Sequence, residues 1–252
     1  MGRLNNRVAI VTGAAQGIGA AYAKAMAAEG ASVVVADRDD GQQIVDQIIK
    51  GGGTALNIVT DVSDETSCKA MAAQTIDAFG RIDILVNNAA LFGHLDAKPF
   101  EEISVDEWDA LMAVNVRGVF VAIKSVTGQM RKQQYGKIIN IASGTLFKGT
   151  PMLLHYVTSK GAVLAMTRCI SREVGDDNIC VNTLAPGLVM SENVLARDTF
   201  SDAGVDANTE TRALKRRQMP EDLTGAMIFL ASADSDFMTG QCVVVDGGSV
   251  NN

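Results

Sequence analysis

One segment near the N-terminus indicates the fold, and it reads Thr12-Gly13-Ala14-Ala15-Gln16-Gly17-Ile18-Gly19. An apolar run, Val8 to Thr12, precedes the glycines and an amphipathic stretch, Gly17 to Glu29, follows them, so they are expected to join a strand to a helix. Glycine lets the backbone turn tightly, and a helix N-terminus offers unpaired N–H groups and a partial positive charge. The spacing G-x-x-x-G-x-G differs from the common G-x-G-x-x-G fingerprint, but in this context it predicts a pyrophosphate site.

The alternation of strand and helix continues along the chain. β-branched runs predict strands at Val8–Thr12, Ser32–Asp37, Ala55–Val59, Ile84–Asn87, Lys137–Ala142, Ile179–Leu184 and Cys242–Asp246. Amphipathic stretches predict helices at Gly17–Glu29, Gly41–Lys50, Asp64–Phe79, Val105–Arg131, Tyr156–Gly175 and Pro220–Ala231. Continuously apolar strands that alternate with helices are typical of a parallel sheet covered on both faces. We therefore expect one α/β domain over residues 1–252, a Rossmann fold with a doubly wound, seven-stranded parallel sheet.

Composition narrows the classes of partner. The chain has 252 residues, 47% of them hydrophobic, with 22 Lys and Arg against 29 Asp and Glu and a net charge of −7. This balance argues against binding to nucleic acid or to anionic lipid, because both need a basic surface. Apolar runs such as residues 226–231 are far shorter than the roughly 20 residues of a membrane span. The N-terminus lacks a signal-peptide core, so we expect a cytoplasmic protein.

The cysteines and histidines do not suggest a metal site or a disulfide framework. Cys68, Cys169, Cys180 and Cys242 form no C-x-x-C pair, and the chain has only two histidines, His94 and His155. We therefore expect neither metal catalysis nor structural disulfides.

Polar residues follow the predicted strands at the point where each strand ends. They are Gly13, Asp37, Asp61, Asn87 with Asn88, Ser143, and Pro186 with Gly187. Ligands of such sheets bind outside the carboxyl ends of the strands, so these residues are expected to share one site.

Asp37 at the end of the second strand indicates the cofactor. A carboxylate there can accept hydrogen bonds from both hydroxyls of an adenosine ribose and would repel the extra phosphate of NADP. Arg38 could partly neutralise such a phosphate, although an arginine after a strand is more often solvated or stacked. The sequence therefore predicts NAD in preference to NADP.

Tyr156 and Lys160 are four residues apart at the start of a predicted helix, which places them on one helix face. A phenol titrates at about 10 and is a poor base at neutral pH unless its phenolate is stabilised. A nearby ammonium and the positive ring of an oxidised nicotinamide would lower that pKa. Ser143 could donate a hydrogen bond to a substrate carbonyl or accept one from an alcohol.

Asn115 lies seven residues after Trp108, on the apolar face of its predicted helix. An unpaired buried amide costs about 1–3 kcal/mol, so Asn115 is either a structural amide bonded to neighbouring backbone or the anchor of a proton-relaying water near Lys160. His155 points about 100° around the helix from Tyr156 and is expected to be a spectator or to lie at the pocket rim. His94 is expected in a surface loop.

Taken together, the motifs resemble those of the short-chain dehydrogenase/reductases over nearly the whole chain. In chain order they are T-G-x-x-x-G-I-G at 12–19, Asp61-Val62, Asn87-Asn88-Ala89-Ala90, Asn115, Ser143, Tyr156-x-x-x-Lys160 and Pro186-Gly187. Their joint occurrence in this order is highly specific. Ala90 replaces a usual glycine, and Ser191 replaces a common threonine while keeping the hydroxyl.

The resemblance implies a role for each catalytic residue. Tyr156 would be the general acid/base, Ser143 would polarise the carbonyl, Lys160 would hold the nicotinamide ribose and lower the tyrosine pKa, and Asn115 would position a relay water. It also implies cofactor contacts for Gly13, Gln16, Gly17, Ile18, Gly19, Asp37, Asp61, Val62, Asn87, Pro186, Gly187, Val189 and Ser191. Asp61 would contact the adenine, Asn87 the adenosine side, and Pro186, Gly187 and Val189 the nicotinamide.

We therefore expect an NAD-dependent oxidoreductase that interconverts a secondary alcohol and a ketone. Apolar segments at Leu91-Phe92, Leu146-Phe147, Met152-Leu153-Leu154 and Leu188-Val189-Met190 indicate a compact hydrophobic substrate, cyclic or aromatic. Residues 188–217 are expected to form a substrate lid. The resemblance further implies a homotetramer, with the long helices and the final strand in its interfaces.

Three alternatives remain open. A 3-ketoacyl-carrier-protein reductase would normally use NADPH and a basic surface for an acidic partner, which Asp37 and the net charge of −7 disfavour. Enoyl reductases of this family place their Tyr and Lys further apart. A non-catalytic, dinucleotide-sensing protein on the same fold would be supported by loss of Tyr156 or Lys160, and both are present.

Overall fold

Buried, mostly β-branched runs form one parallel sheet in the computed structural model, which describes residues 2–92, 95–195 and 202–250. The strands are β1 (Val8–Thr12), β2 (Ser32–Asp37), β3 (Thr54–Val59), β4 (Ile84–Asn87), β5 (Gly136–Ile141), β6 (Ile179–Pro186) and β7 (Cys242–Val245). Their order is β3-β2-β1-β4-β5-β6-β7, and all six neighbouring pairs are parallel. This confirms the predicted seven-stranded Rossmann fold.

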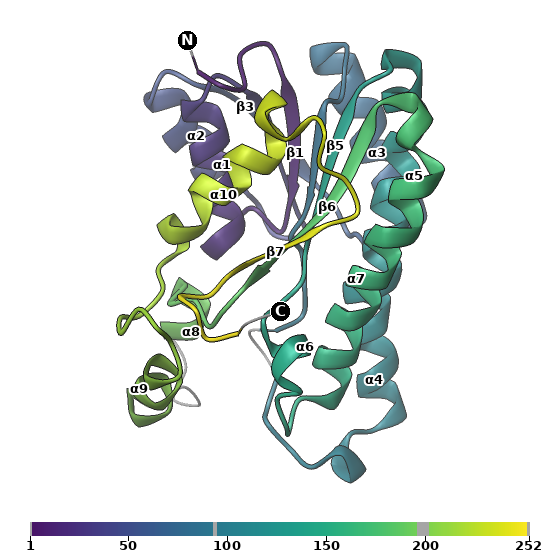
Figure 1. The fold of residues 1–252 in the computed structure, drawn as a ribbon. Helices are drawn as coiled ribbons and strands as arrows, with labels where there is room; N and C mark the ends of the chain where they lie inside the picture. Colours follow the sequence, from purple (N-terminus) through teal and green to yellow (C-terminus); the bar gives the residue numbers. More distant parts are fainter. Residues whose placement is uncertain (1, 93–94, 196–201, 251–252) are drawn as a thin grey trace.

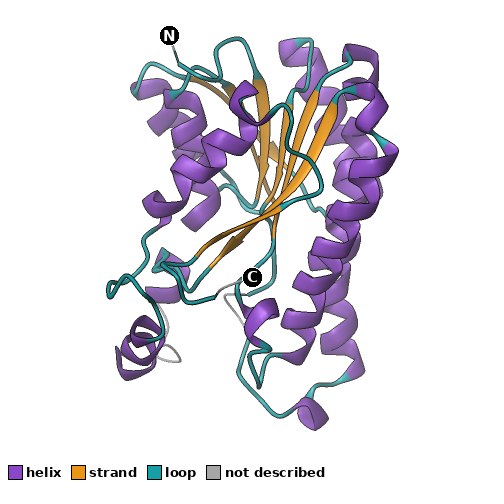
Figure 2. Cartoon of the chain, in the orientation of Figure 1, coloured by secondary structure: helices purple, strands orange, loops and turns teal. Residues whose placement is uncertain are grey.

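Two layers of helices cover the sheet (Figures 1 and 2). On one face lie α1 (Gly17–Ala28), α2 (Gln42–Lys50) and α10 (Thr224–Ala231), and on the other lie α3 (Glu65–Phe79), α5 (Val119–Gln133) and α7 (Leu154–Glu173). Each layer encloses its own apolar core, with Met26 and Met227 in the first and Met71 and Val126 in the second. The helices α4 (Val105–Met112), α6 (Thr145–Lys148), α8 (Glu192–Leu195) and α9 (Asp202–Glu210) extend beyond the carboxyl ends of the strands (Figure 1).

The strand order places a crevice at the centre of this edge. From β1 the chain moves outward to β2 and β3, and then crosses back to β4 on the other side of β1. The chain therefore continues from β1 and from β4 to helices on opposite faces of the sheet, and a ligand can lie in the crevice that opens at this point.

The helix predicted over Val105–Arg131 is interrupted. Residues Ala113–Gly118 form a π-helical segment between α4 and α5, which contains Asn115. At its end the backbone of Gly118 lies so close to the core that an added Cβ would be 2.9 Å from Cγ2 of Val62. Hydrophobic periodicity does not reveal such a break, because the extra residue of a π turn is accommodated locally.

By length and composition alone, the continuous segment Val105–Gln133 could cross a membrane, and it is the one such segment among the described residues. A core helix meets the same criterion. Val121, Val126 and Met130 of this segment are buried in the apolar core.

A buried polar network fastens α7 to the sheet. Asn87 on β4 donates to Oδ1 of Asn140 on β5 (2.8 Å), and Asn140 donates to Oγ1 of Thr167 on α7 (2.8 Å). Thr183 on β6 donates to the same hydroxyl at 2.8 Å, and Thr167 donates to the carbonyl of Val163 at 3.0 Å. All four side chains are at most 3% exposed, so every lost partner would leave a desolvated polar group.

We expect Thr167→Val to destabilise the fold by about 1–3 kcal/mol, because the isosteric methyl group leaves the donors of Asn140 and Thr183 unpaired. Urea unfolding followed by circular dichroism measures this free energy. Thr127→Val is the matched control, because that hydroxyl bonds only the carbonyl of Ile123 in its own helix. Equal stability losses in the two variants would contradict the network.

Candidate active site

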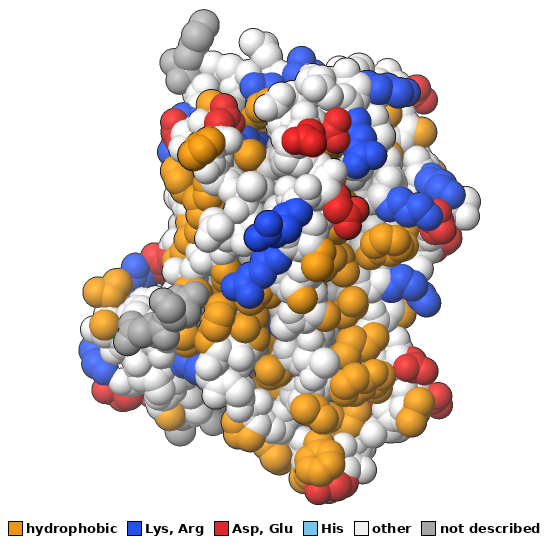
Figure 3. Space-filling model, turned by 45° about the vertical axis from the view of Figure 1, so that its right-hand side comes forward, with side chains coloured by type: hydrophobic (Ala, Val, Ile, Leu, Met, Phe, Trp, Pro, Cys, Tyr) orange, Lys and Arg blue, Asp and Glu red, His pale blue; other side chains and the backbone are white. Residues whose placement is uncertain are grey.

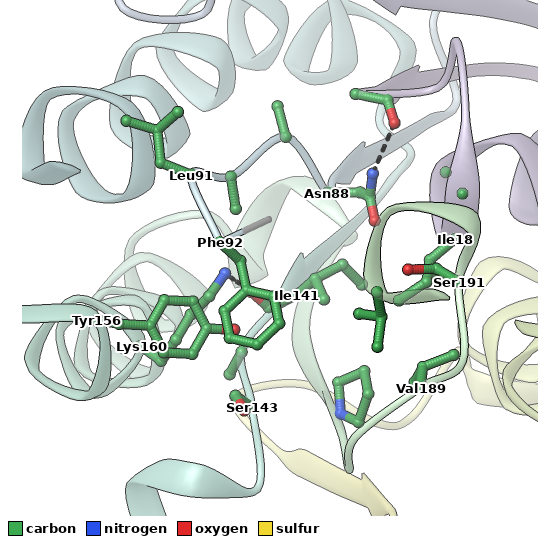
Figure 4. Close-up of a pocket in the computed structure, with 18 of the residues that line it drawn as sticks. Ile18, Asn88, Leu91, Phe92, Ile141, Ser143, Tyr156, Lys160, Val189 and Ser191 are labelled. Atoms are coloured by element: carbon green, nitrogen blue, oxygen red, sulfur yellow. Dashed lines mark hydrogen bonds between the residues drawn. The ribbon is translucent and has the colours of Figure 1, made fainter. Parts of the chain in front are cut away.

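A cavity of about 430 Å³ runs along the carboxyl edge of the sheet. It extends from Asp37, at the end of β2, and Asp61, after β3, to Tyr156 and Lys160 on α7. Figure 4 shows Ser143, Tyr156 and Lys160 on one side of the pocket and Ile18, Val189 and Ser191 across from them, with the Phe92 ring between. The structure thus brings most of the predicted site residues to one cavity.

The glycine-rich segment is shaped by close backbone contacts. Gly13 has φ of +65°, and a Cβ there would be 2.7 Å from Cα of Ala89. A Cβ on Gly19 would overlap the carbonyl oxygen of Gly13, so both positions exclude any side chain. Gln16 precedes α1 and makes no side-chain cap, and Gly17 and Ile18 of the first turn line the cavity. The uncapped N–H groups of this turn form an anion cradle.

The side chains of Asp37 and Asp61 are held at the far end of the cavity. Oδ2 of Asp37 accepts from the N–H of Ala15 (2.9 Å), and Oδ1 accepts from the N–H of Asp39 (3.1 Å). The Ser63 hydroxyl bonded to Asp61 is the main cause that lowers the pKa of this carboxyl, and Arg38 contributes through its charge. Val62, also predicted, lines the cavity beside Asp61.

Asn88, rather than Asn87, directs its side chain to this region. Nδ2 of Asn88 donates to the carbonyls of Thr12 (2.9 Å) and Gly13 (3.0 Å), which holds the glycine loop in place. The side chain of Asn87 instead points into the core and bonds Asn140, and Asn87 does not line the cavity. Successive residues of a strand face opposite sides, so only one of two adjacent amides can reach the site.

The segment after β6 forms a wall of the cavity. Pro186, Gly187, Val189 and Ser191 line it, as the sequence predicted. A Cβ on Gly187 would be 2.9 Å from Cβ of Asp246, so this turn is packed against the residue after β7. Val189 is further held by a bridge to Gln218.

Ser143, Tyr156 and Lys160 converge at the end of β5. Oγ of Ser143 accepts from the N–H (3.3 Å) and the hydroxyl (3.0 Å) of Thr145. The Tyr156 ring lies 4.7 Å from the ring of Phe92, centroid to centroid. Nζ of Lys160 donates to the carbonyl of Ile141 (2.8 Å) and lies 5.6 Å from the Tyr156 ring centroid.

Burial dominates the titration of these groups. It raises the pKa of Tyr156 to about 12, against the lowering effect of a hydrogen bond with Ser143. It also lowers the pKa of Lys160 to about 8. The sequence predicted that Lys160 would lower the tyrosine pKa, but in this structure the lowering cause is the hydrogen bond with Ser143, and desolvation outweighs it. Tyr156 is therefore a phenol at neutral pH, with a proton to donate.

Asn115 is fully buried and does not line the cavity. Its Oδ1 accepts from the N–H of Leu91 (2.8 Å), and its Nδ2 donates to the carbonyl of Leu91 (3.3 Å) and to Oγ of Ser159 (3.2 Å). Ser159 in turn donates to the carbonyl of Tyr156 at 2.7 Å. These contacts give the amide the partners that a structural role requires, and they brace the start of α7, while the relay-water role stays a prediction.

His155 does not lie at the pocket rim. It is fully buried where α4 packs on α7, and Nε2 is 3.3 Å from Oε1 of Glu107. Of the two roles expected for His155, the rim position was wrong, because the contact between these two helices cannot be read from spacing, and its place outside the cavity agrees with a spectator. The remaining prediction, for His94, lies outside the described residues.

The predicted lid at 188–217 is described except for residues 196–201. Val194, Asn208 and Arg212 of this segment line the cavity. Arg212 is buried, and its guanidinium donates to the carbonyls of Leu188 (2.7 Å) and Arg216 (2.8 Å).

Sequence reasoning missed several lining residues, among them Lys148, Arg212, Asp246 and Ser249. Asp246 could have been found, since it directly follows β7, and Asp37 likewise stands at the carboxyl end of β2. The sequence pattern around Lys148, Arg212 and Ser249 does not indicate that these residues line a cavity.

Comparison with known proteins agrees with this architecture. The family model described as enoyl-(acyl carrier protein) reductase matches residues 13–250. An uncharacterized oxidoreductase of Mycobacterium tuberculosis is 41% identical over 249 residues, 98% of each chain. A short-chain dehydrogenase/reductase of Hericium erinaceus is 36% identical over 97% of this chain and 98% of the relative.

A solved structure from Beutenbergia cavernae, provisionally assigned as an NAD(P)-dependent gluconate 5-dehydrogenase and holding NADP at low occupancy, superposes with a TM-score of 0.90. It is 36% identical, over 98% of this chain and 97% of that one. The sequence matches, the shared fold and the motif residues gathered in one cavity lead to the same conclusion: the chain belongs to the short-chain dehydrogenase/reductase family, and it is an oxidoreductase of that family.

Proposed function

We propose that the protein is an NAD-dependent oxidoreductase that interconverts a secondary alcohol and a ketone, with Tyr156 as the general acid/base. The observation that carries the proposal is one continuous cavity with an anion cradle and Asp37 toward one end and Ser143, Tyr156 and Lys160 toward the other. A dinucleotide is long enough to join two such ends, and it would place its nicotinamide beside the hydroxyl groups.

The residues present fit such a cofactor. Gly13 and Gly19 leave no room for a Cβ, and the N-terminus of α1 faces the cavity with uncapped N–H groups, as a pyrophosphate requires. Asp37 would hold the adenosine ribose, and Pro186, Gly187, Val189 and Ser191 would line the nicotinamide end. When bound, the cofactor would supply or accept the hydride.

The side chains would handle the proton. In ketone reduction, the Tyr156 hydroxyl, kept protonated by burial, would donate its proton to the substrate oxygen while the Ser143 hydroxyl donates a hydrogen bond to the same oxygen. In alcohol oxidation the tyrosine would take that proton back. The Lys160 ammonium would stabilise the phenolate that forms, and the Asn115–Ser159 bonds would keep α7 in position.

The walls near the reacting groups favour an apolar substrate. Leu91, Phe92, Leu153 and Leu188 line the cavity, whereas Leu146, Phe147, Met152, Leu154 and Met190 of the same predicted segments do not. The matched family model is named for enoyl reductases, but the four-residue spacing of Tyr156 and Lys160 supports reduction of a carbonyl group. The cytoplasmic location and the independence from nucleic acid and membranes stay predictions from the sequence.

We expect Tyr156→Phe to lower alcohol oxidation by about 10²- to 10⁴-fold while NADH binding is retained, because only the proton-carrying hydroxyl is removed. NADH formation with a panel of secondary alcohols and NADH fluorescence titration measure the two effects. Tyr135→Phe is the matched control, since that tyrosine stacks under Arg7 away from the cavity. Near-normal turnover of Tyr156→Phe would mean that another group carries the proton.

We expect Asp37→Ala to lower kcat/KM with NAD by about 10- to 100-fold, because a charged hydrogen-bond acceptor is lost. The same change should raise kcat/KM with NADP, because the repulsion of its phosphate is removed. Asp37→Asn keeps an acceptor oxygen for the ribose but removes the charge that would repel the NADP phosphate. It should therefore reduce the preference for NAD over NADP with a smaller loss of kcat/KM for NAD. Equal use of NAD and NADP by the unmutated enzyme would refute the assigned preference.

We also propose a homotetramer. Figure 3 shows hydrophobic side chains gathered on the face of α5 and α7, and Val105, Phe120 and Leu154 are 74%, 48% and 46% exposed. Apolar surface of this kind is common at subunit interfaces. Light scattering should give four times the chain mass of 26.6 kDa, and a mass of one chain would exclude the assembly.

A further inference from the structure

Lys148 is a cation of the cavity that the proposed reaction does not use. It is the last residue of α6, five residues after Ser143, and it lines the cavity. Its Nζ donates to Oγ1 of Thr211 (3.2 Å) and to Oγ of Ser249. Three segments that are remote in the sequence therefore bring one ammonium and two hydroxyl groups together.

The position of Ser249 is set by its neighbours. Oδ1 of Asp246 accepts from the N–H groups of Gly248 (2.9 Å) and Ser249 (3.1 Å), which fixes the turn after β7. The N–H of Leu214 donates to the carbonyl of Gly247 (2.9 Å), which holds this turn against the segment that carries Thr211. The hydroxyl groups around Lys148 are thus placed by backbone hydrogen bonds.

The charge of Lys148 is not neutralised. Lys98, Lys124 and Lys137 pair with carboxylates, but Lys148 has no carboxylate partner within the described ranges. An ammonium has three N–H donors, and two of them are accounted for. The neighbouring cation, Arg212, directs its terminal nitrogens to Leu188, Arg216 and Asn208. Lys148 therefore keeps a donor for a bound ligand.

We propose that Lys148, positioned by the hydroxyls of Thr211 and Ser249, binds an anionic group on the substrate through its remaining N–H donor. The substrate would then be a secondary alcohol or ketone with an apolar body against Leu153 and Leu188 and a carboxylate at the end away from the reacting carbon. This inference rests on the proposed function. The other source of an anion is the cofactor, but the cradle that fits its pyrophosphate is built from Gly13 to Gly19, on different elements.

The test compares ketones that differ only in this charge. The probes are 4-acetylbenzoate with 4-acetylbenzamide and 5-oxohexanoate with 5-oxohexanamide, each reduced with NADH. We expect the wild-type enzyme to prefer the acid in at least one pair, and Lys148→Met to reduce the acid-over-amide ratio of kcat/KM roughly 10- to 100-fold, mainly through KM. Lys148→Arg should keep most of the ratio.

The matched control is Lys215→Met, which removes an exposed lysine that bonds Glu210 and does not line the cavity. Calorimetric titration of 4-(1-hydroxyethyl)benzoate onto the enzyme–NADH complex gives a readout without turnover. It should show binding that Lys148→Met weakens and Lys215→Met does not.

Three outcomes would overturn the inference. They are a wild-type enzyme without preference for either acid, equal losses of kcat/KM for acid and amide in Lys148→Met, or NADH binding that Lys148→Met weakens by the same factor as kcat/KM for the acid. The last would assign Lys148 to the cofactor phosphates. Failure to reduce any of the four ketones would count against the proposed function instead, and the titration would still decide whether Lys148 binds the anion.

Discussion

The contact between the turns after β1 and β4 is the constraint on which the site depends. The backbone of Gly13 lies against Ala89 so closely that no side chain fits, and Asn88 ties the two turns together through the carbonyls of Thr12 and Gly13. With the loops locked at this distance, α1 starts with its N–H groups facing the crevice, and the first turn of the helix can receive an anion. The rest of the cavity extends outward from this point.

The reacting groups depend on a second set of fixed contacts. Tyr156 and Lys160 lie on α7, which is bound to the sheet through Thr167 and to the π-helical segment through Asn115 and Ser159. Both attachments are buried, so α7 cannot shift without leaving polar groups unpaired. The same burial keeps Tyr156 protonated and lowers the pKa of the Lys160 ammonium. The packing of the helix therefore sets the chemistry of the site.

Charge is distributed unevenly along the cavity. Asp37, Asp39 and Asp61 stand toward one end together with a single cation, Arg38. Lys148, Lys160 and Arg212 line the other part together with Asp246. These cations stand out in a chain with a net charge of −7. Under the proposed function, the carboxylates at the cofactor end would repel added negative charge, and the cations at the substrate end would attract it.

The sequence by itself determined the seven strands, the long helices and the oxidoreductase family. Buried strands such as β2 and β4 are continuous apolar runs, so their bounds could be predicted to the residue, and the spacing of Tyr156 and Lys160 is a property of one helix. Tertiary structure alone decided which of Asn87 and Asn88 faces the cavity, where the π turn interrupts the helix, and that His155 is buried against Glu107. It alone brought Lys148, Thr211 and Ser249 together. The physical reason is that strand and helix periods act over a few residues, whereas these contacts join segments whose distance is set only when the sheet and its helices pack.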